Sequence, residues 1–222
     1  MNHSAKTDKS AVLTIIGLIT MVLLTITKVV PSSQIAGYSV FAGIVFFFIV
    51  EAAAKTRNSE SGLRFSTVVA DIRQPGVLLW MLLPVVSTVV TFAIGTLVFK
   101  ENFVSHVMGR TGSLLDFDKI PLLIGQVMIA ALGEEIAFRG FFVGKGMKIA
   151  PFWVCAAVSS VVFAAGHIAL GDVGLVTYDV ATIFIDSMIF AILYRKSDNC
   201  LICAVSHALC NAAGIAAALT LF

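Results

Sequence analysis

This sequence has few charged residues. Only 13% of its 222 residues are Asp, Glu, Lys or Arg, whereas 59% are hydrophobic. Soluble domains carry about 25% charged residues, so lipid must be the solvent for most of the chain. The formal net charge is only +2, and no basic run with interleaved aromatic residues occurs. This composition excludes a typical nucleic-acid-binding surface.

Cysteine is scarce as well. Cys155, Cys200, Cys203 and Cys210 lie within or at the edge of apolar segments, which favours a role as small hydrophobic residues. Cys200 and Cys203 form one CxxC pair. A zinc or redox site of this type needs a second ligand pair or a thioredoxin-like context, and the sequence has neither.

Long apolar runs, by contrast, are abundant. About 20 mainly apolar residues cross the hydrocarbon core as a helix, and no alternating pattern of a membrane barrel is present. The runs cover residues 11–30, 35–54, 76–99, 120–143, 152–170, 174–194 and 200–222. We therefore expect an all-α fold, a polytopic membrane helix bundle of about seven transmembrane helices that forms a single domain over residues 1–222. The first run is long for a signal peptide, so we expect it to be retained as an anchor.

Lysine and arginine are distributed unevenly between the two sides of such a bundle. With the N-terminus inside, the inner side receives Lys6, Lys9, Lys55, Arg57, Arg64, Arg73, Lys145, Lys148, Arg195 and Lys196. The outer side receives only Lys28, Lys100, Arg110 and Lys119. This bias predicts a cytoplasmic N-terminus and an external C-terminus. The two long polar loops, 55–74 and 100–119, have room for a short surface helix.

The fourth apolar run contains three ionisable residues, which are costly inside a membrane. Glu135 and Arg139 are one helical turn apart and can pair on one face. Glu134 lies about 100° around the helix from Glu135 and cannot share that geometry. Glu134 is therefore the acid that requires a separate explanation.

Two of the four histidines, His167 and His207, also fall in apolar runs. A lone buried histidine is more often a satisfied core residue than a functional one. Asn211, however, follows His207 by one turn, and together with Glu134 these groups can activate a water and stabilise an oxyanion. The depths of Glu134 and His207 agree, and predict a funnel that opens on the cytoplasmic side. His167 lies deeper, a difference that helix tilt or a fifth helix beginning after Trp153 would remove.

Asp179 and Asp186 are seven residues apart in the sixth run and share a helix face. Hydrogen bonding between helices, or a water-lined cavity, is the favoured interpretation of this pair. Support for the site and a proton path remain open. Gly133, Gly140, Gly144 and Gly166 flank the polar residues, and small residues of this kind indicate close helix packing.

Three segments together resemble a known family. Glu134-Glu135-x-x-x-Arg139, Phe163-x-x-x-His167 and His207-x-x-x-Asn211 are similar to the motifs of the CAAX protease and bacteriocin-processing (CPBP) family, which includes type II CAAX prenyl endopeptidases and bacterial Abi proteins. The motifs stand in order in three separate apolar runs, between residues 134 and 211. The resemblance implies a catalytic four-helix core in residues 120–222, preceded by three spans in residues 1–119.

The resemblance also implies an intramembrane endopeptidase whose substrate is a peptide or membrane protein. Glu134 would be the general base, His167 would help to hold the water, and His207 and Asn211 would bind the oxyanion. Glu135, Arg139 and Phe163 would act in support. No cofactor is expected. A zinc site of Glu134, His167 and His207 is the less favoured alternative, because the sequence has no HExxH and asparagine is a poor zinc ligand.

Two other functions stay open. Glu134, Asp186 and the histidines would also suit an ion-coupled transporter, although the internal repeat that is common in carriers is not detected. A non-catalytic immunity or scaffold protein would keep the motif for packing alone. The sequence does not identify the substrate, its prenylation or the oligomeric state.

Overall fold

The structure is a bundle of helices, and the computed structural model describes residues 2–29, 36–111 and 119–221. No strand occurs in those ranges. The α-helices are α1 (Asn2–Val29), α2 (Ala36–Ala54), α3 (Val68–Ile72), α4 (Val77–Phe99), α5 (Glu101–Thr111), α6 (Ile120–Glu135), α7 (Phe152–Ala165), α8 (Val173–Ser197) and α9 (Cys200–Leu221). A short 3₁₀ helix, η1 (Asn58–Glu60), follows α2, and a π-helix, η2 (Ile136–Lys145), continues α6. Three of the predicted boundaries of the apolar runs, Val30, Ile35 and Phe222, lie outside the described residues.

The predicted all-α membrane bundle is confirmed. Six helical segments within the described residues are long and apolar enough to cross a membrane. The seventh apolar helix, α7, has 14 residues and is therefore about 21 Å long, shorter than the hydrocarbon core of about 30 Å. Many aliphatic side chains on the long helices point outward, such as Leu79 (66% exposed) and Ile129 (74% exposed). An aliphatic surface of this extent suits lipid, and the chain is a multi-pass membrane protein.

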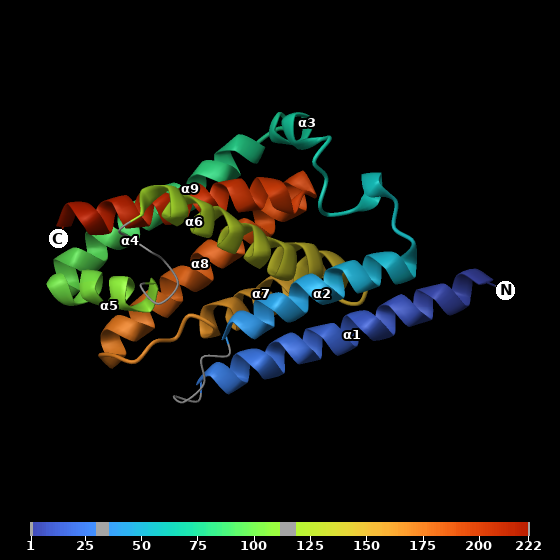
Figure 1. The fold of residues 1–222 in the computed structure, drawn as a ribbon, viewed down its shortest axis with the longest axis horizontal. Helices are drawn as coiled ribbons and strands as arrows, with labels where there is room; N and C mark the ends of the chain where they lie inside the picture. Colours follow the sequence, from blue (N-terminus) through green and yellow to red (C-terminus); the bar gives the residue numbers. More distant parts are fainter. Residues whose placement is uncertain (1, 30–35, 112–118, 222) are drawn as a thin grey trace.

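The helices run back and forth between two ends of the bundle (Figure 1). The N-terminus lies at one end and the C-terminus at the other. Helices α1 and α2 form an antiparallel pair along one edge, and α2 packs on η2. Helix α9 contacts both α4 and α6, while α8 contacts α4 and α7. Helices α7 and α9 and the π-helix η2 each contact α8, and α6 contacts α9, so the motif-bearing segments meet in one part of the bundle.

Close packing around η2 depends on small residues. A Cβ atom at Gly43 of α2 would lie 2.6 Å from the Cβ of Ala137, so the two backbones can approach only because position 43 has no side chain. Gly144 leaves room for the hydroxyl of Tyr194 in the same way. The close packing predicted from Gly140 and Gly144 is confirmed, since a Cβ at Gly140 would lie 3.1 Å from the ring of Phe47.

Both long loops carry surface helices, as predicted. The first contains η1 and α3, and the second contains α5. Helix α3 and the loop before it are tied to the α8–α9 turn through Asp71 of α3. Asn199 donates to Asp71 over 3.0 Å, Thr67 donates over 2.7 Å, and Arg64 lies 3.4 Å away. Burial by itself would raise the pKa of Asp71, but these hydrogen bonds and the charge of Arg64 outweigh it and hold the pKa below its usual range.

We predict that Asp71→Asn destabilises the protein by about 1–3 kcal/mol at neutral pH, because the donors around position 71 lose a charged acceptor. The pKa of Asp71 is lowered by folding, so its stabilising effect is present above the unfolded pKa of about 3.9 and is lost as the pH falls through the folded value. Thermal unfolding in detergent from neutral pH to about pH 3 should show the gap between the proteins closing. The control is Glu60→Gln, at an exposed position of the same loop; a gap independent of pH would contradict the prediction.

Candidate active site

The two adjacent glutamates lie where α6 becomes the π-helix η2. Glu135 is the last residue of α6, and Ile136 is the first of η2. π-helical segments are rare and often accompany functional sites, because the wider turn redirects the side chains that follow. Glu135 is fully buried, whereas the side chain of Glu134 is 23% exposed. The two acids therefore differ in environment, as the sequence indicates.

Glu135 holds two partners with one oxygen. Nη1 of Arg139 donates to Oε1 of Glu135 over 2.9 Å, which confirms the predicted pair. Nδ1 of His207 lies 2.8 Å from the same oxygen. The pair predicted as a purely local support of one helix thus reaches across to α9 and orients a histidine there.

His207 is placed between the two glutamates. With Nδ1 on Glu135, its Nε2 faces Glu134, and the distance to Oε2 is 3.7 Å. Because the carboxylate accepts at Nδ1, that nitrogen carries a proton, and Nε2 is the atom presented to the cavity. The ring also stacks on Phe190 of α8, with 4.9 Å between centroids and an interplanar angle of 27°. The predicted meeting of Glu134 and His207 is confirmed.

Arg139 is packed between Glu135, Ser187 and two aromatic rings. It is fully buried, and its Nη2 donates to the backbone oxygen and the hydroxyl of Ser187, over 3.1 and 3.0 Å. The guanidinium carbon also lies 4.9 Å from the ring centre of Phe163 and 5.2 Å from that of Phe190. A buried charge is tolerated when its donors are used and aromatic faces surround it.

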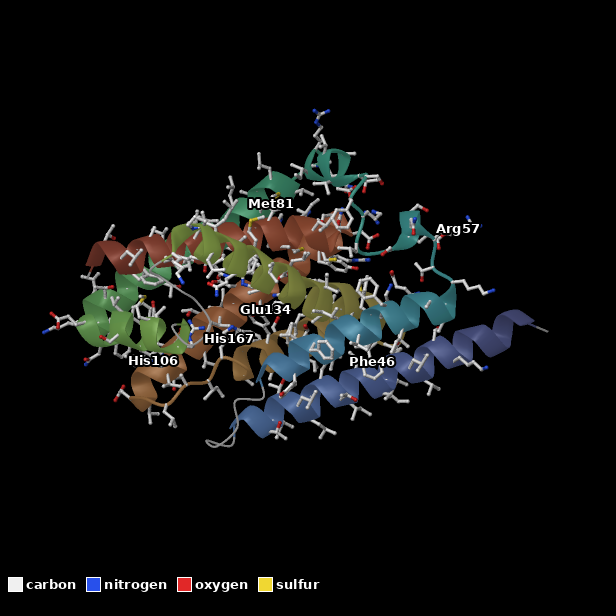
Figure 2. The ribbon with its side chains drawn as sticks, in the orientation of Figure 1. Phe46, Arg57, Met81, His106, Glu134 and His167 are labelled. Carbon is white, nitrogen blue, oxygen red and sulfur yellow. The ribbon has the colours of Figure 1, made fainter. Side chains whose placement is uncertain are left out.

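His167 lies just beyond a helix and not within one. Helix α7 starts at Phe152 and ends at Ala165, so the start after Trp153 that would reduce the depth of His167 is not observed. The Nδ1 atom of His167 lies 2.8 Å from the backbone oxygen of Phe163, and the two rings are 4.6 Å apart. This contact fixes the imidazole in the turn after α7. Figure 2 shows Glu134 on α6 and His167 after α7, both in the middle of the molecule.

The predicted site residues line one cavity of about 330 Å³. Glu134, His167, His207 and Asn211 all contribute to its wall, as does the supporting residue Phe163. A cavity of this size is at the lower end of the range for small-molecule sites and holds a few residues of an extended peptide. The structure therefore brings together all four residues predicted to be catalytic.

The cavity extends away from the N-terminal end of the bundle. Its wall includes Thr25 near the end of α1, Phe103 on α5 and Ala218 near the end of α9, all at the end opposite the N-terminus (Figure 1). On the other side, Arg139 and Phe141 are fully buried. The cavity thus extends toward the end opposite the N-terminus, whereas the sequence predicts a funnel on the cytoplasmic side; which end is cytoplasmic stays a prediction.

Asp179 lies in the cavity wall and is neutralised by α5. Nε of Arg110 is 3.2 Å from its carboxylate, and Nε2 of His106 is 3.1 Å away. These contacts agree with hydrogen bonding between helices, the favoured interpretation of Asp179. Neither partner was recognised from the sequence, because α5 lies outside the apolar runs. Ser187 and Phe190 were missed for a similar reason, since serine and phenylalanine in an apolar run carry no signal.

The side chains of the alternative zinc site share one cavity, to which Glu134, His167 and His207 all contribute. Nδ1 of His207 faces Glu135 and Nδ1 of His167 faces the Phe163 carbonyl. Within the described ranges, no group of three or more His, Cys, Asp or Glu side chains is spaced to hold a metal ion. Metal dependence stays a prediction that the metal analysis below tests.

Comparison with known proteins supports the resemblance seen in the motifs. Residues 116–213 match the family described as type II CAAX prenyl endopeptidase, Rce1-like. The matched segment contains all three motifs and every predicted site residue. The match implies protease activity and a peptide or protein substrate. No curated protein and no solved structure matches the chain.

We predict that Arg139→Met destabilises the protein by about 3–5 kcal/mol, because the buried Glu135 loses the guanidinium that pairs with it and keeps only His207. The double variant Glu135→Gln/Arg139→Met should recover part of that loss, since both charges are removed. Unfolding in mixed detergent micelles measures both values, with the exposed Lys148→Met as control. Additive losses in the double variant would contradict the shared role of Glu135.

Proposed function

We propose that this protein, whose residues 116–213 match the Rce1-like endopeptidases, is an intramembrane endopeptidase with a glutamate-activated water. The observation that carries the proposal is the placement of His207. Its Nδ1 is held by Glu135 over 2.8 Å, and its Nε2 faces Glu134 at 3.7 Å in a cavity shared with Asn211 and His167. This geometry leaves Glu134 as the carboxylate that can take a proton.

The reaction begins with a water between Glu134 and the scissile carbonyl. Glu134 accepts a proton from that water, and the resulting hydroxide attacks the carbonyl carbon. His167 helps to hold the water. The tetrahedral oxyanion accepts hydrogen bonds from Nε2 of His207 and from the amide of Asn211. The carbon–nitrogen bond then breaks, and Glu134 returns its proton to the departing amine.

Glu135 makes His207 a suitable donor. While Nδ1 donates to Glu135, Nε2 can donate to the oxyanion only when the ring carries both protons. The negative charge of Glu135 compensates the positive ring in a site that Phe190 and Phe163 shield from water. We assign Glu135, Arg139 and Phe163 to positioning, and we assign no metal to the mechanism.

Glu134→Gln should abolish cleavage, with a loss of about 10²–10⁴ in rate, while the protein still folds. Asn211→Ala should lower kcat by about 10²–10³, because one oxyanion donor is removed. Comparison of peptide termini in membranes that contain wild-type or Glu134→Gln protein measures the first effect, with metal analysis of the purified protein alongside. The control Glu101→Gln lies at an exposed position of α5. Unchanged termini across all three samples would contradict the protease and favour a transporter or scaffold.

We also propose a cytoplasmic N-terminus and an external C-terminus, from the distribution of Lys and Arg. The cavity would then be approached from the external half of the bilayer. In that case Gly109→Cys on α5, where an added side chain meets nothing within 4 Å, should react with an impermeant maleimide in intact cells. Ser59→Cys on η1 should react only after permeabilisation. The four native cysteines are buried, and the opposite labelling pattern would reverse the orientation.

A further inference from the structure

One acidic residue in the cavity has no role in the mechanism above. Asp186 of α8 lines the same cavity as Glu134 and His207. Its Oδ1 atom is buried and has no hydrogen-bond partner among the described residues, while the Ser87 side chain of α4 lies near the carboxyl group. A carboxylate at membrane depth with one oxygen that accepts no hydrogen bond is costly. A group that enters the cavity and pairs with this carboxylate would offset that cost.

The other acids around the cavity already have partners. Asp179 contacts Arg110 and His106, and Glu135 contacts Arg139 and His207. No described Lys, Arg or His lies within ion-pair distance of Asp186, whereas Glu134 faces His207. Among the described residues of the cavity wall, Arg110 is the single Lys or Arg. Asp179 neutralises it. The wall therefore carries more negative than positive charge, and Asp186 is the acid left for an incoming group.

The position of Asp186 along α8 relates it to the reacting bond. Asp179, Ile183, Asp186 and Phe190 all line the cavity, so one face of α8 follows the cavity from its outer part to His207. Phe190 stacks on His207, and Asp186 lies one turn, about 6 Å, along α8 from Phe190. An extended peptide advances about 3.3 Å per residue. Asp186 thus faces a substrate about two residues from the carbonyl bound at His207.

We propose that Asp186 is a specificity-determining residue that accepts the ammonium or guanidinium group of a basic substrate side chain about two residues from the scissile bond. The inference rests on the proposed peptidase function, which supplies the position of the scissile carbonyl. A lysine or arginine there pairs with the Asp186 carboxylate and neutralises it. A neutral side chain leaves that carboxylate without a cation. The substrates are accordingly peptides with a basic residue next to an apolar cleavage site.

Binding can be tested without turnover in the Glu134→Gln variant, purified in a neutral detergent. The probes are acetyl-Leu-Ala-Lys-Ala-Leu-amide and the same peptide with glutamine in place of lysine, which differ in one charge. We expect the lysine peptide to bind at least about tenfold more tightly, as a desolvated ion pair requires. Adding Asp186→Asn should bring the ratio of the two affinities close to one.

The matched control is Thr182→Val, one turn away on the same face of α8, where the hydroxyl bonds to the Asp179 carbonyl. This variant should keep the preference for lysine. Equal binding of both peptides before substitution, or a preference that survives Asp186→Asn, would overturn the proposal. The binding experiment does not depend on catalysis. Failure of the wild-type protein to cleave any peptide would therefore contradict the proposed peptidase function and leave the binding result intact.

Turnover separates specificity from a proton-relay role. The substrates are peptides that the wild-type protein cleaves, made in pairs with lysine or glutamine at each position within two residues of the cleavage site. Asp186→Asn should raise KM about tenfold or more for the favoured lysine peptide. The glutamine peptide should change little. An equal fall in kcat for both peptides would assign Asp186 to proton transfer and overturn the proposal.

Discussion

The carboxylate of Glu135 is the group on which the rest of the site depends. One of its oxygens accepts from Arg139 and lies 2.8 Å from His207, so it joins η2 to α9 inside the bilayer. Such a shared acceptor is stable only where both partners are buried and well aligned. Arg139 in turn reaches Ser187 of α8, and the network therefore fixes three helices around one charge. Glu134 is left outside this network, beside it and open to the cavity.

The two adjacent acids, Glu134 and Glu135, lie in different environments because their side chains leave the helix in different directions. In a helix, neighbouring side chains diverge by about 100°, and here the divergence places Glu135 in a closed polar network and Glu134 in a cavity of about 330 Å³. Arg139 and aromatic rings lie on one side of the site, and the cavity extends toward the end where α5 lies. That direction also places Asp179 and Asp186 along the way in, one neutralised by α5 and the other not.

Much of the fold could be predicted from the sequence, because apolar runs and the length of a span constrain membrane helices strongly. The predicted run at 76–99 differs by one residue from α4. The Glu135–Arg139 pair followed from helical spacing, and the meeting of Glu134 with His207 followed from matching depths. These inferences use the spacing of residues along a helix and their depth in the membrane. Both can be estimated from the sequence.

The rest required the packed structure. Helix α7 ends at Ala165 although the apolar run continues, because hydropathy does not distinguish a helix from the turn after it. The bond from His207 to Glu135 depends on how η2 and α9 are rotated about their axes, which depth alone does not determine. The direction of the cavity depends on which side the large buried side chains fill. Arg110 and His106 were invisible as partners of Asp179, since α5 folds back from a polar loop.

The most direct test of this account is an experimental structure of the Glu134→Gln variant with an uncleaved peptide bound. The account predicts that the scissile carbonyl oxygen lies within hydrogen-bond distance of Nε2 of His207 and the Asn211 amide, while Nδ1 of His207 remains on Glu135. A water should lie between position 134 and the carbonyl carbon. A peptide bound with its carbonyl away from His207, or a histidine released from Glu135 to bind Glu134, would contradict it.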